Sequence, residues 1–215
     1  MLIFINVFLC NRKFWYLLLI IIQLHAMDTI RMVSFSTKNL KRELIISSKQ
    51  LESFQLFLKD LIKNKLLIIN TNLGVEIYYY APVSCEYLIQ DVFFLIACNS
   101  KYERKDFIVK SLNSEAELKV EINALFIRLC RNPLLFKSYL KSITNQINNN
   151  YHKNPEIIDA LFKLWKKQFL KLKDIKGMHK LMPLLIRFQD ESLEKNYNPV
   201  LQSLLKQAVS LNRVN

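Results

Sequence analysis

The dipeptide Asn-Pro occurs three times in the second half of the chain, each time before an apolar segment that carries lysines. The copies are Asn132-Pro133, Asn154-Pro155 and Asn198-Pro199. At the start of a helix, an asparagine side chain accepts a hydrogen bond from a free N–H of the first turn. Proline suits the next position because its ring fixes φ near the helical value and because an N–H there would lack a partner. Each pair therefore predicts the first turn of a helix.

The predicted helix starts recur at a regular interval. With a fourth start near Met178, after Gly177, the starts at 133, 155, 178 and 199 are 22, 23 and 21 residues apart. One helix of about four to five turns and a short loop fill such an interval. Two of these units span 44 residues, which lies within the range of about 40 to 47 for HEAT and armadillo repeats.

Over roughly residues 115–215 the chain resembles the HEAT/armadillo-like α-solenoid class, through helix length and period and without a diagnostic motif. The resemblance implies stacked antiparallel helix hairpins that bind partners along one surface. An irregular helical domain with similar caps is the alternative. In both cases we expect an all-α fold.

The rest of the chain also favours helices. Apolar residues recur at helical spacing from residue 37 to residue 65, with Ser47 or Ser48 as an internal cap. Residues 87–98 are apolar on nearly all sides, which predicts a helix buried in the middle of the domain. A shorter helix is expected over 106–112, and Ser114 with Glu117 forms a capping box for the next one.

Residues 66–80 are the exception, because they are rich in β-prone side chains. Leu66 to Ile69 and Val75 to Tyr80 flank a polar turn that contains Gly74, so a short β-hairpin near residues 66–80 is one interpretation. The other is a helix that ends near Asn70 and is followed by a loop. Because an isolated two-stranded hairpin is marginally stable in water, we favour the helix and loop.

Residues 1–26 form a hydrophobic leader, and we expect residues 27–215 to form a single α-helical domain. The apolar run from Phe14 to Leu24 follows Arg12 and Lys13, as in the core of a signal peptide. A membrane-spanning helix needs about 20 apolar residues, and a longer span here would bury both basic residues. A dispensable extension, a signal peptide and a membrane anchor remain three open interpretations.

The four cysteines are widely spaced and form neither a C-x-x-C motif nor a zinc-site pattern. Free thiols in a reducing compartment are the simplest interpretation. We therefore expect a cytoplasmic or nuclear protein. The alternative is membrane association or the secretory pathway, if residues 1–26 act as an anchor or a signal.

Motifs for catalysis are missing from the sequence. The three histidines have no partner at helical spacing that could share a metal ion. With only two glycines, Gly74 and Gly177, the chain holds no P-loop, no dinucleotide-binding motif and no nucleophile elbow. We therefore expect neither enzymatic activity nor a cofactor or metal site.

The helix from Pro155 is predicted to carry basic residues opposite its apolar arc. From residue 153 to residue 180, eight lysines against three acidic residues leave a local charge of +5. This charge suits an acidic protein, a phosphate backbone or anionic lipid, although a solvated outer face shows the same pattern. Five residues of this helix form the candidate contact face, which we call the lysine face: Lys163, Lys166, Lys167, Lys171 and Lys173.

The net charge of +13 is weaker evidence for a partner than it looks. Of the 31 basic residues, 23 are lysines, in a chain also rich in Asn, Ile, Phe and Tyr, all of which have A/T-rich codons. Arginine and interleaved aromatic residues, which recognise phosphates and bases, are scarce on the lysine face. Sequence-specific nucleic-acid binding is therefore not expected.

Together these patterns predict a non-enzymatic helical scaffold or adaptor that acts through protein–protein interactions. One alternative is a membrane-associated accessory protein anchored by residues 1–26. Another is a basic helical protein that binds nucleic acid non-specifically.

Overall fold

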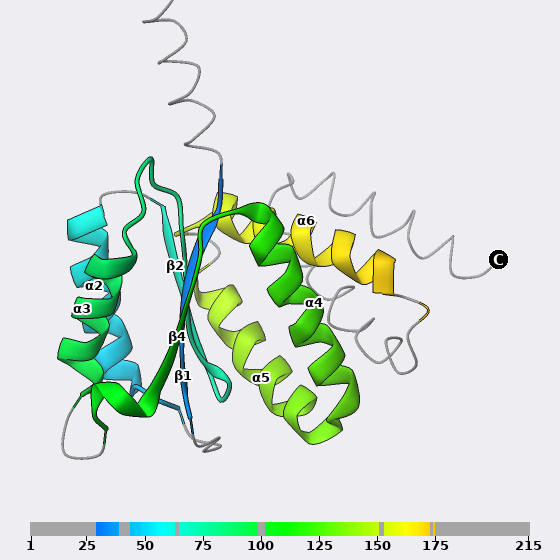
Figure 1. Cartoon of the computed structure of the whole chain (residues 1–215), viewed down its shortest axis with the longest axis horizontal. Helices are drawn as coiled ribbons and strands as arrows, with labels where there is room; N and C mark the ends of the chain where they lie inside the picture. The colour runs from blue at the N-terminus through cyan, green and yellow to red at the C-terminus, as the bar shows by residue number, and fades with distance from the viewer. Residues whose placement is uncertain are drawn as a thin grey trace, which may run out of the picture.

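A computed structural model describes residues 29–38, 44–62, 65–98, 102–150, 153–172 and 174. In these residues a four-stranded antiparallel sheet lies between two layers of helices (Figure 1). The sheet has the order β2-β3-β1-β4, and the strands are β1 (Arg31–Thr37), β2 (Leu66–Thr71), β3 (Gly74–Tyr79) and β4 (Phe107–Leu112). The prediction of an all-α fold of stacked helix hairpins is therefore wrong, and the fold is mixed α/β.

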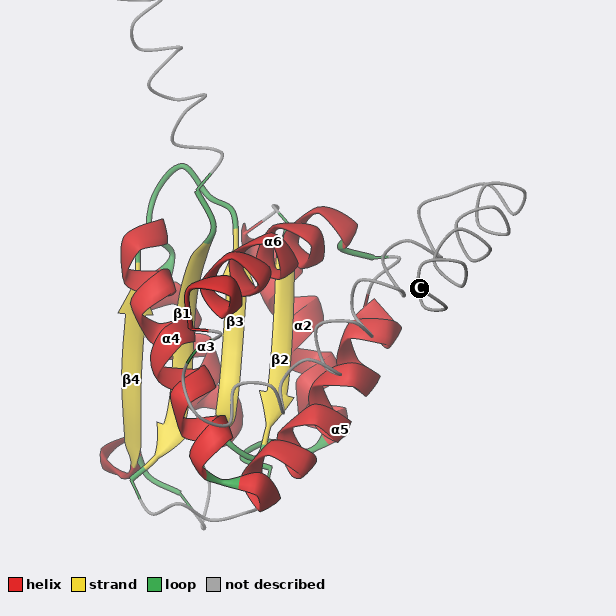
Figure 2. Cartoon of the chain, turned by 90° about the vertical axis from the view of Figure 1, so that its right-hand side faces the viewer, coloured by secondary structure: helices red, strands yellow, loops and turns green. Residues whose placement is uncertain are grey.

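The helices cover both faces of the sheet. One face is covered by α2 (Ser48–Ile62) and α3 (Glu86–Ala97). The other is covered by α4 (Glu115–Arg131), α5 (Pro133–Asn150) and α6 (Pro155–Leu172), which Figure 2 shows in front of the strands. Because these three helices pack on a sheet, they do not form the solenoid that their spacing predicts.

Strand β1, which the sequence analysis does not anticipate, lies inside the sheet and pairs with both β3 and β4. Its side chains alternate between the two faces, as the period of a strand requires. Val33 and Phe35 belong to the core beneath α2 and α3, whereas Met32 belongs to the core beneath α4 to α6. The hydrophobic core is thus divided into two by the sheet.

Strands β2 and β3 form a hairpin, so the favoured helix and loop over residues 66–80 is wrong and the alternative is confirmed. The two strands meet at the pair Thr71 and Gly74. Gly74 has φ of 145°, and a Cβ there would lie 2.2 Å from the carbonyl oxygen of Phe35. The hairpin is stable here because β1 pairs with β3 and helices cover both faces, so it is not isolated.

The segments predicted as helices over residues 37–65 and 106–112 also differ. Residues 107–112 form β4, which follows a short 3₁₀ turn, Arg104–Asp106. Of the two residues predicted as the cap, Ser47 and Ser48, it is Ser47 that precedes helix α2, which begins at Ser48 and ends at Ile62 before β2. The Ser47 hydroxyl accepts from the N–H of Gln50, whose side-chain oxygen accepts from the N–H of Ser47. Ser47 therefore starts this helix and does not divide a longer one.

Helix α3 is buried on one face only, although its composition predicts burial all round. Phe93 is fully buried, whereas Leu95 is 75% exposed. The helix lies in an outer layer, so only the side towards the sheet is covered (Figure 1).

Helix α5 closes the β2 edge of the sheet through a side chain. The Gln146 side chain accepts from the backbone N–H of Asn70 at 2.6 Å and donates to the backbone carbonyl oxygen of the same residue. The Ser142 hydroxyl donates to that carbonyl oxygen at 3.1 Å. These contacts satisfy backbone groups of an edge strand that would otherwise be open to another chain.

The helix starts predicted at Pro133 and Pro155 are confirmed. The Asn132 side-chain oxygen accepts from the N–H of Leu135 at 3.1 Å, as an N-cap does, and the Ser114 capping box is present. The starts predicted near Met178 and at Pro199 lie outside the described residues, as do residues 1–26. Of the helices that the structure describes, none combines the length and the apolar character needed to cross a bilayer.

Candidate functional site

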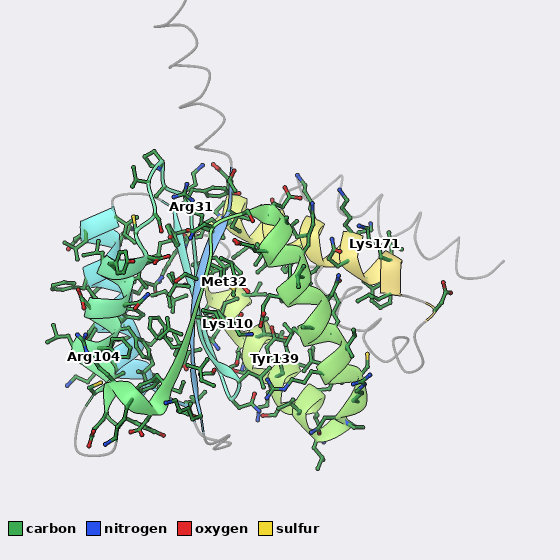
Figure 3. The ribbon with its side chains drawn as sticks, viewed as in Figure 1. Arg31, Met32, Arg104, Lys110, Tyr139 and Lys171 are labelled. Carbon is green, nitrogen blue, oxygen red and sulfur yellow. The ribbon has the colours of Figure 1, made fainter. Side chains whose placement is uncertain are left out.

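The lysine face is assembled on α6 as its spacing predicts. Four of its five members, Lys163, Lys166, Lys167 and Lys171, are exposed on the side of α6 opposite the buried Trp165. Lys171 is labelled in Figure 3, and Lys173 lies outside the described residues. The four lysines form no ion pair with any described residue. Contact with a partner through this face stays a prediction.

A second exposed feature lies on the opposite helical layer, where large apolar side chains reach solvent. Phe57 and Leu61 on α2 are 50% and 44% exposed, and Leu88 and Leu95 on α3 are 37% and 75% exposed. We call these four residues the α2–α3 apolar surface. The sequence does not predict this surface, because the apolar residues of α3 indicate a helix that is buried on all sides.

The two helices that carry this surface are neighbours. The side-chain amide of Gln50, in the first turn of α2, donates to the carbonyl oxygen of Ile96 at the end of α3, at 2.9 Å. The helices are therefore antiparallel neighbours, as Figure 1 shows. Phe57 and Leu61 follow Gln50 by about two and three helical turns, so they lie on the side of α2 that faces α3.

The charge of this layer differs from that of the rest of the chain. Helix α2 carries two lysines and two acidic residues, and α3 carries two acidic residues and no basic one, so together they carry a net charge of −2. Residues 133–172, which hold α5 and α6, have seven lysines against two acidic residues, a net charge of +5. The exposed apolar side chains thus lie in an acidic part of a basic protein.

A cavity of about 200 Å³ lies between the sheet and α4. Its floor is formed by strand residues and its roof by α4, and it includes both apolar and polar side chains. The polar lining residues are Ser34, Ser36, Glu76, Tyr78, Lys110, Glu121 and Arg128.

Glu76 is the least expected member of this cavity, because it stands on β3 among apolar residues. The Tyr78 hydroxyl donates to Oε2 of Glu76 at 2.8 Å. Burial raises the pKa of Glu76 from about 4.5 to about 7; the Tyr78 hydrogen bond opposes this shift, and the nearby charge of Glu121 adds to it. The single acid in the strand sequence VEIYY is the signal that could have found this residue.

Lys110 does not neutralise Glu76, because it is bound to another acid. Its Nζ donates to both carboxylate oxygens of Glu121, at 2.7 and 2.9 Å. Glu76 therefore shares the cavity with an ion pair. Among the described residues, its carboxylate accepts a side-chain hydrogen bond only from the neutral hydroxyl of Tyr78.

Comparisons with protein-family models, with curated proteins and with solved structures gave no match to this chain. Within the described residues, no three His, Cys, Asp or Glu side chains gather closely enough to hold a metal ion.

Proposed function

We propose that the protein is a non-enzymatic adaptor that binds another protein through the α2–α3 apolar surface. The occupant is an amphipathic helix of the partner, with basic residues beside its apolar stripe. The observation behind the proposal is the α2–α3 apolar surface, which holds four of the six large apolar side chains that these two adjacent helices leave exposed. A contiguous apolar patch on a folded protein is typical of an interaction site.

The geometry of the surface suits a helix. Phe57 and Leu61 are four residues apart, and Leu88 and Leu95 are seven apart. Each pair thus forms a ridge along its own helix. The apolar stripe of a partner helix, with anchors at i, i+4 and i+7, can pack along such ridges.

The charge of the surface selects among partners. Because α2 and α3 carry a net charge of −2, they attract basic flanks and repel acidic ones. An anionic membrane surface is disfavoured at this layer for the same reason. The location we propose for this activity is cytoplasmic or nuclear, as the cysteine spacing predicts.

The experiment replaces Leu95 in the full chain with a photo-crosslinking amino acid and maps the crosslinked residues. We expect adducts on the apolar stripe of one amphipathic helix of another protein. The purified partner should then bind the double variant Phe57→Ser, Leu95→Ser at least tenfold more weakly than the original chain. Both substitutions are at exposed positions, and an unchanged thermal unfolding curve would show that the variant is folded.

A matched control reverses the charge of Lys163, Lys166, Lys167 and Lys171, which lie on the opposite layer. Affinity that falls with this control and not with the apolar variant would overturn the proposal. Adducts only with a second copy of the chain, together with a dimer in analytical ultracentrifugation, would also overturn it, as would the absence of any adduct.

A further inference from the structure

The cavity beneath α4 carries polar groups that the proposed adaptor function does not use. We propose that this cavity binds a small organic cation, a protonated amine on a short apolar body, through the carboxylate of Glu76. This site lies on the opposite face of the sheet from the α2–α3 apolar surface.

The floor of the site follows from the sheet register. Ser34 on β1 is paired with Glu76 on β3 and with Lys110 on β4. Directly opposed residues of an antiparallel sheet point to the same face. All three side chains therefore face α4, whose Glu121 closes the cavity from above.

The cavity offers hydrogen-bond acceptors that lack donors. Tyr78 donates to Oε2 of Glu76, and no described residue donates to Oε1. Among the same residues, the hydroxyls of Ser34 and Ser36 have no hydrogen-bond partner. Solvent reaches these oxygen atoms, and an ammonium group, which brings three donors, can bond to them in place of water.

The charges around Glu76 favour a cation. Strand β3 contributes only the neutral Tyr78, and β4 contributes Lys110, which Glu121 already binds through both of its oxygens. On α5, the fully buried Tyr139 lies near enough for the charge of Glu76 to raise its pKa further, and its hydroxyl has no partner among the described residues. A positive charge beside Glu76 would therefore stabilise its carboxylate.

Arg128 is the one further cation that lines the cavity, and it does not fill this role. It is exposed and lies seven residues from Glu121 along α4, about 10 Å of helix rise. Its exposed charge is screened by water and salt, and it forms no ion pair with Glu76.

The size and the walls of the cavity limit the ligand. At about 30 Å³ for each water-sized group, a volume of about 200 Å³ holds roughly five to seven non-hydrogen atoms. Met32, Leu118, Ile122 and Leu125 supply apolar wall. A straight alkylammonium of about four carbons matches this space.

The test measures binding of n-butylammonium to the full chain by calorimetry at pH 8, with n-butanol as the neutral isostere. We expect saturable one-to-one binding of the amine, and binding at least tenfold weaker for the alcohol. Glu76→Gln should weaken amine binding at least tenfold, while the exposed Glu52→Gln, on α2, should leave it unchanged. Equal binding of the alcohol, unchanged binding by Glu76→Gln, or no saturable binding would overturn the proposal.

The pH dependence supplies a measurement on the unmodified chain. Because the pKa of Glu76 is about 7, its carboxylate is the minor form at pH 6, and amine affinity should be about tenfold lower there than at pH 8. With ¹³C-labelled glutamate, saturating amine should lower the pKa of Glu76 seen by NMR. A pKa that does not move would overturn the proposal even if Glu76→Gln failed to fold.

Discussion

Replacing Phe93 by alanine should destabilise the protein far more than replacing Leu95, two residues away on the same helix. Phe93 is fully buried and stacks on Phe35, with ring centroids 3.7 Å apart and planes inclined by 13°. It also meets the edges or faces of three further rings, with centroid distances of 5.9 Å to Phe54, 5.7 Å to Phe94 and 5.4 Å to Phe107. Because this ring is the centre of an aromatic cluster, we expect Phe93→Ala to lower the free energy of unfolding by about 3–5 kcal/mol.

Leu95→Ala should cost no more than about 0.5 kcal/mol, because the side chain is 75% exposed. If α3 were buried all round, the same substitution would cost about 2–5 kcal/mol. The pair of variants therefore tests which face of α3 lies on the sheet.

The assay is urea unfolding at 25 °C, followed by far-UV circular dichroism and by tryptophan fluorescence. Trp165 is buried in the core on the other face of the sheet, so coincident curves, measured in a Trp15→Phe background to remove the second tryptophan, would show that both cores unfold together. A loss above about 2 kcal/mol for Leu95→Ala, or below about 1 kcal/mol for Phe93→Ala, would refute the packing described here.

Three further predictions concern other parts of the molecule. Gln146→Leu should lower the free energy of unfolding by about 2–3 kcal/mol, since the backbone N–H and carbonyl oxygen of Asn70 lose their side-chain partner. The control in the same urea assay is Asn145→Leu, at the exposed neighbouring position. Equal effects of the two substitutions would argue against the contact between Gln146 and the β2 edge. The stability of the original chain should fall as pH rises from 5 to 8, by at most about 3 kcal/mol. The raised pKa means that folded Glu76 keeps its proton up to about pH 7, whereas the unfolded chain has already released it at lower pH. Glu76→Gln should remove this contribution, and an identical pH profile for the variant would disprove the assignment. The last prediction concerns charge reversal of the exposed members of the lysine face, Lys163, Lys166, Lys167 and Lys171. It should change the free energy of unfolding by less than about 0.5 kcal/mol per site and should abolish any salt-dependent binding to double-stranded DNA. DNA binding that survives the charge reversal would exclude this face as the binding site.

Helix starts were predictable because they depend on a few neighbouring residues. Asn132 caps α5, and Ser114 with Glu117 caps α4, as the sequence indicates. Their regular spacing was still misleading. An interval of about 22 residues fits any helix of this length with a short loop, whether the helix stacks in a solenoid or lies on a sheet.

The strands were harder to predict because their stability comes from distant partners. β1 pairs Met32 with Tyr78 on one side and with Leu112 on the other, so its two neighbours lie 46 and 80 residues away in the chain. The hairpin of β2 and β3 looks marginal when it is considered alone, and it is stable once β1 and two helical layers cover it. Local propensity cannot report such contacts, since it describes each segment without its neighbours.

The same distinction holds for the candidate sites. The sequence by itself determined where α4, α5 and α6 begin and that α6 carries exposed lysines, because caps and amphipathic faces are properties of single segments. Only the tertiary structure decided that Glu76 shares a cavity with Glu121 and that α3 leaves Leu95 in solvent. Both outcomes depend on which face of an element meets the sheet, and strand pairing across the whole domain sets that face.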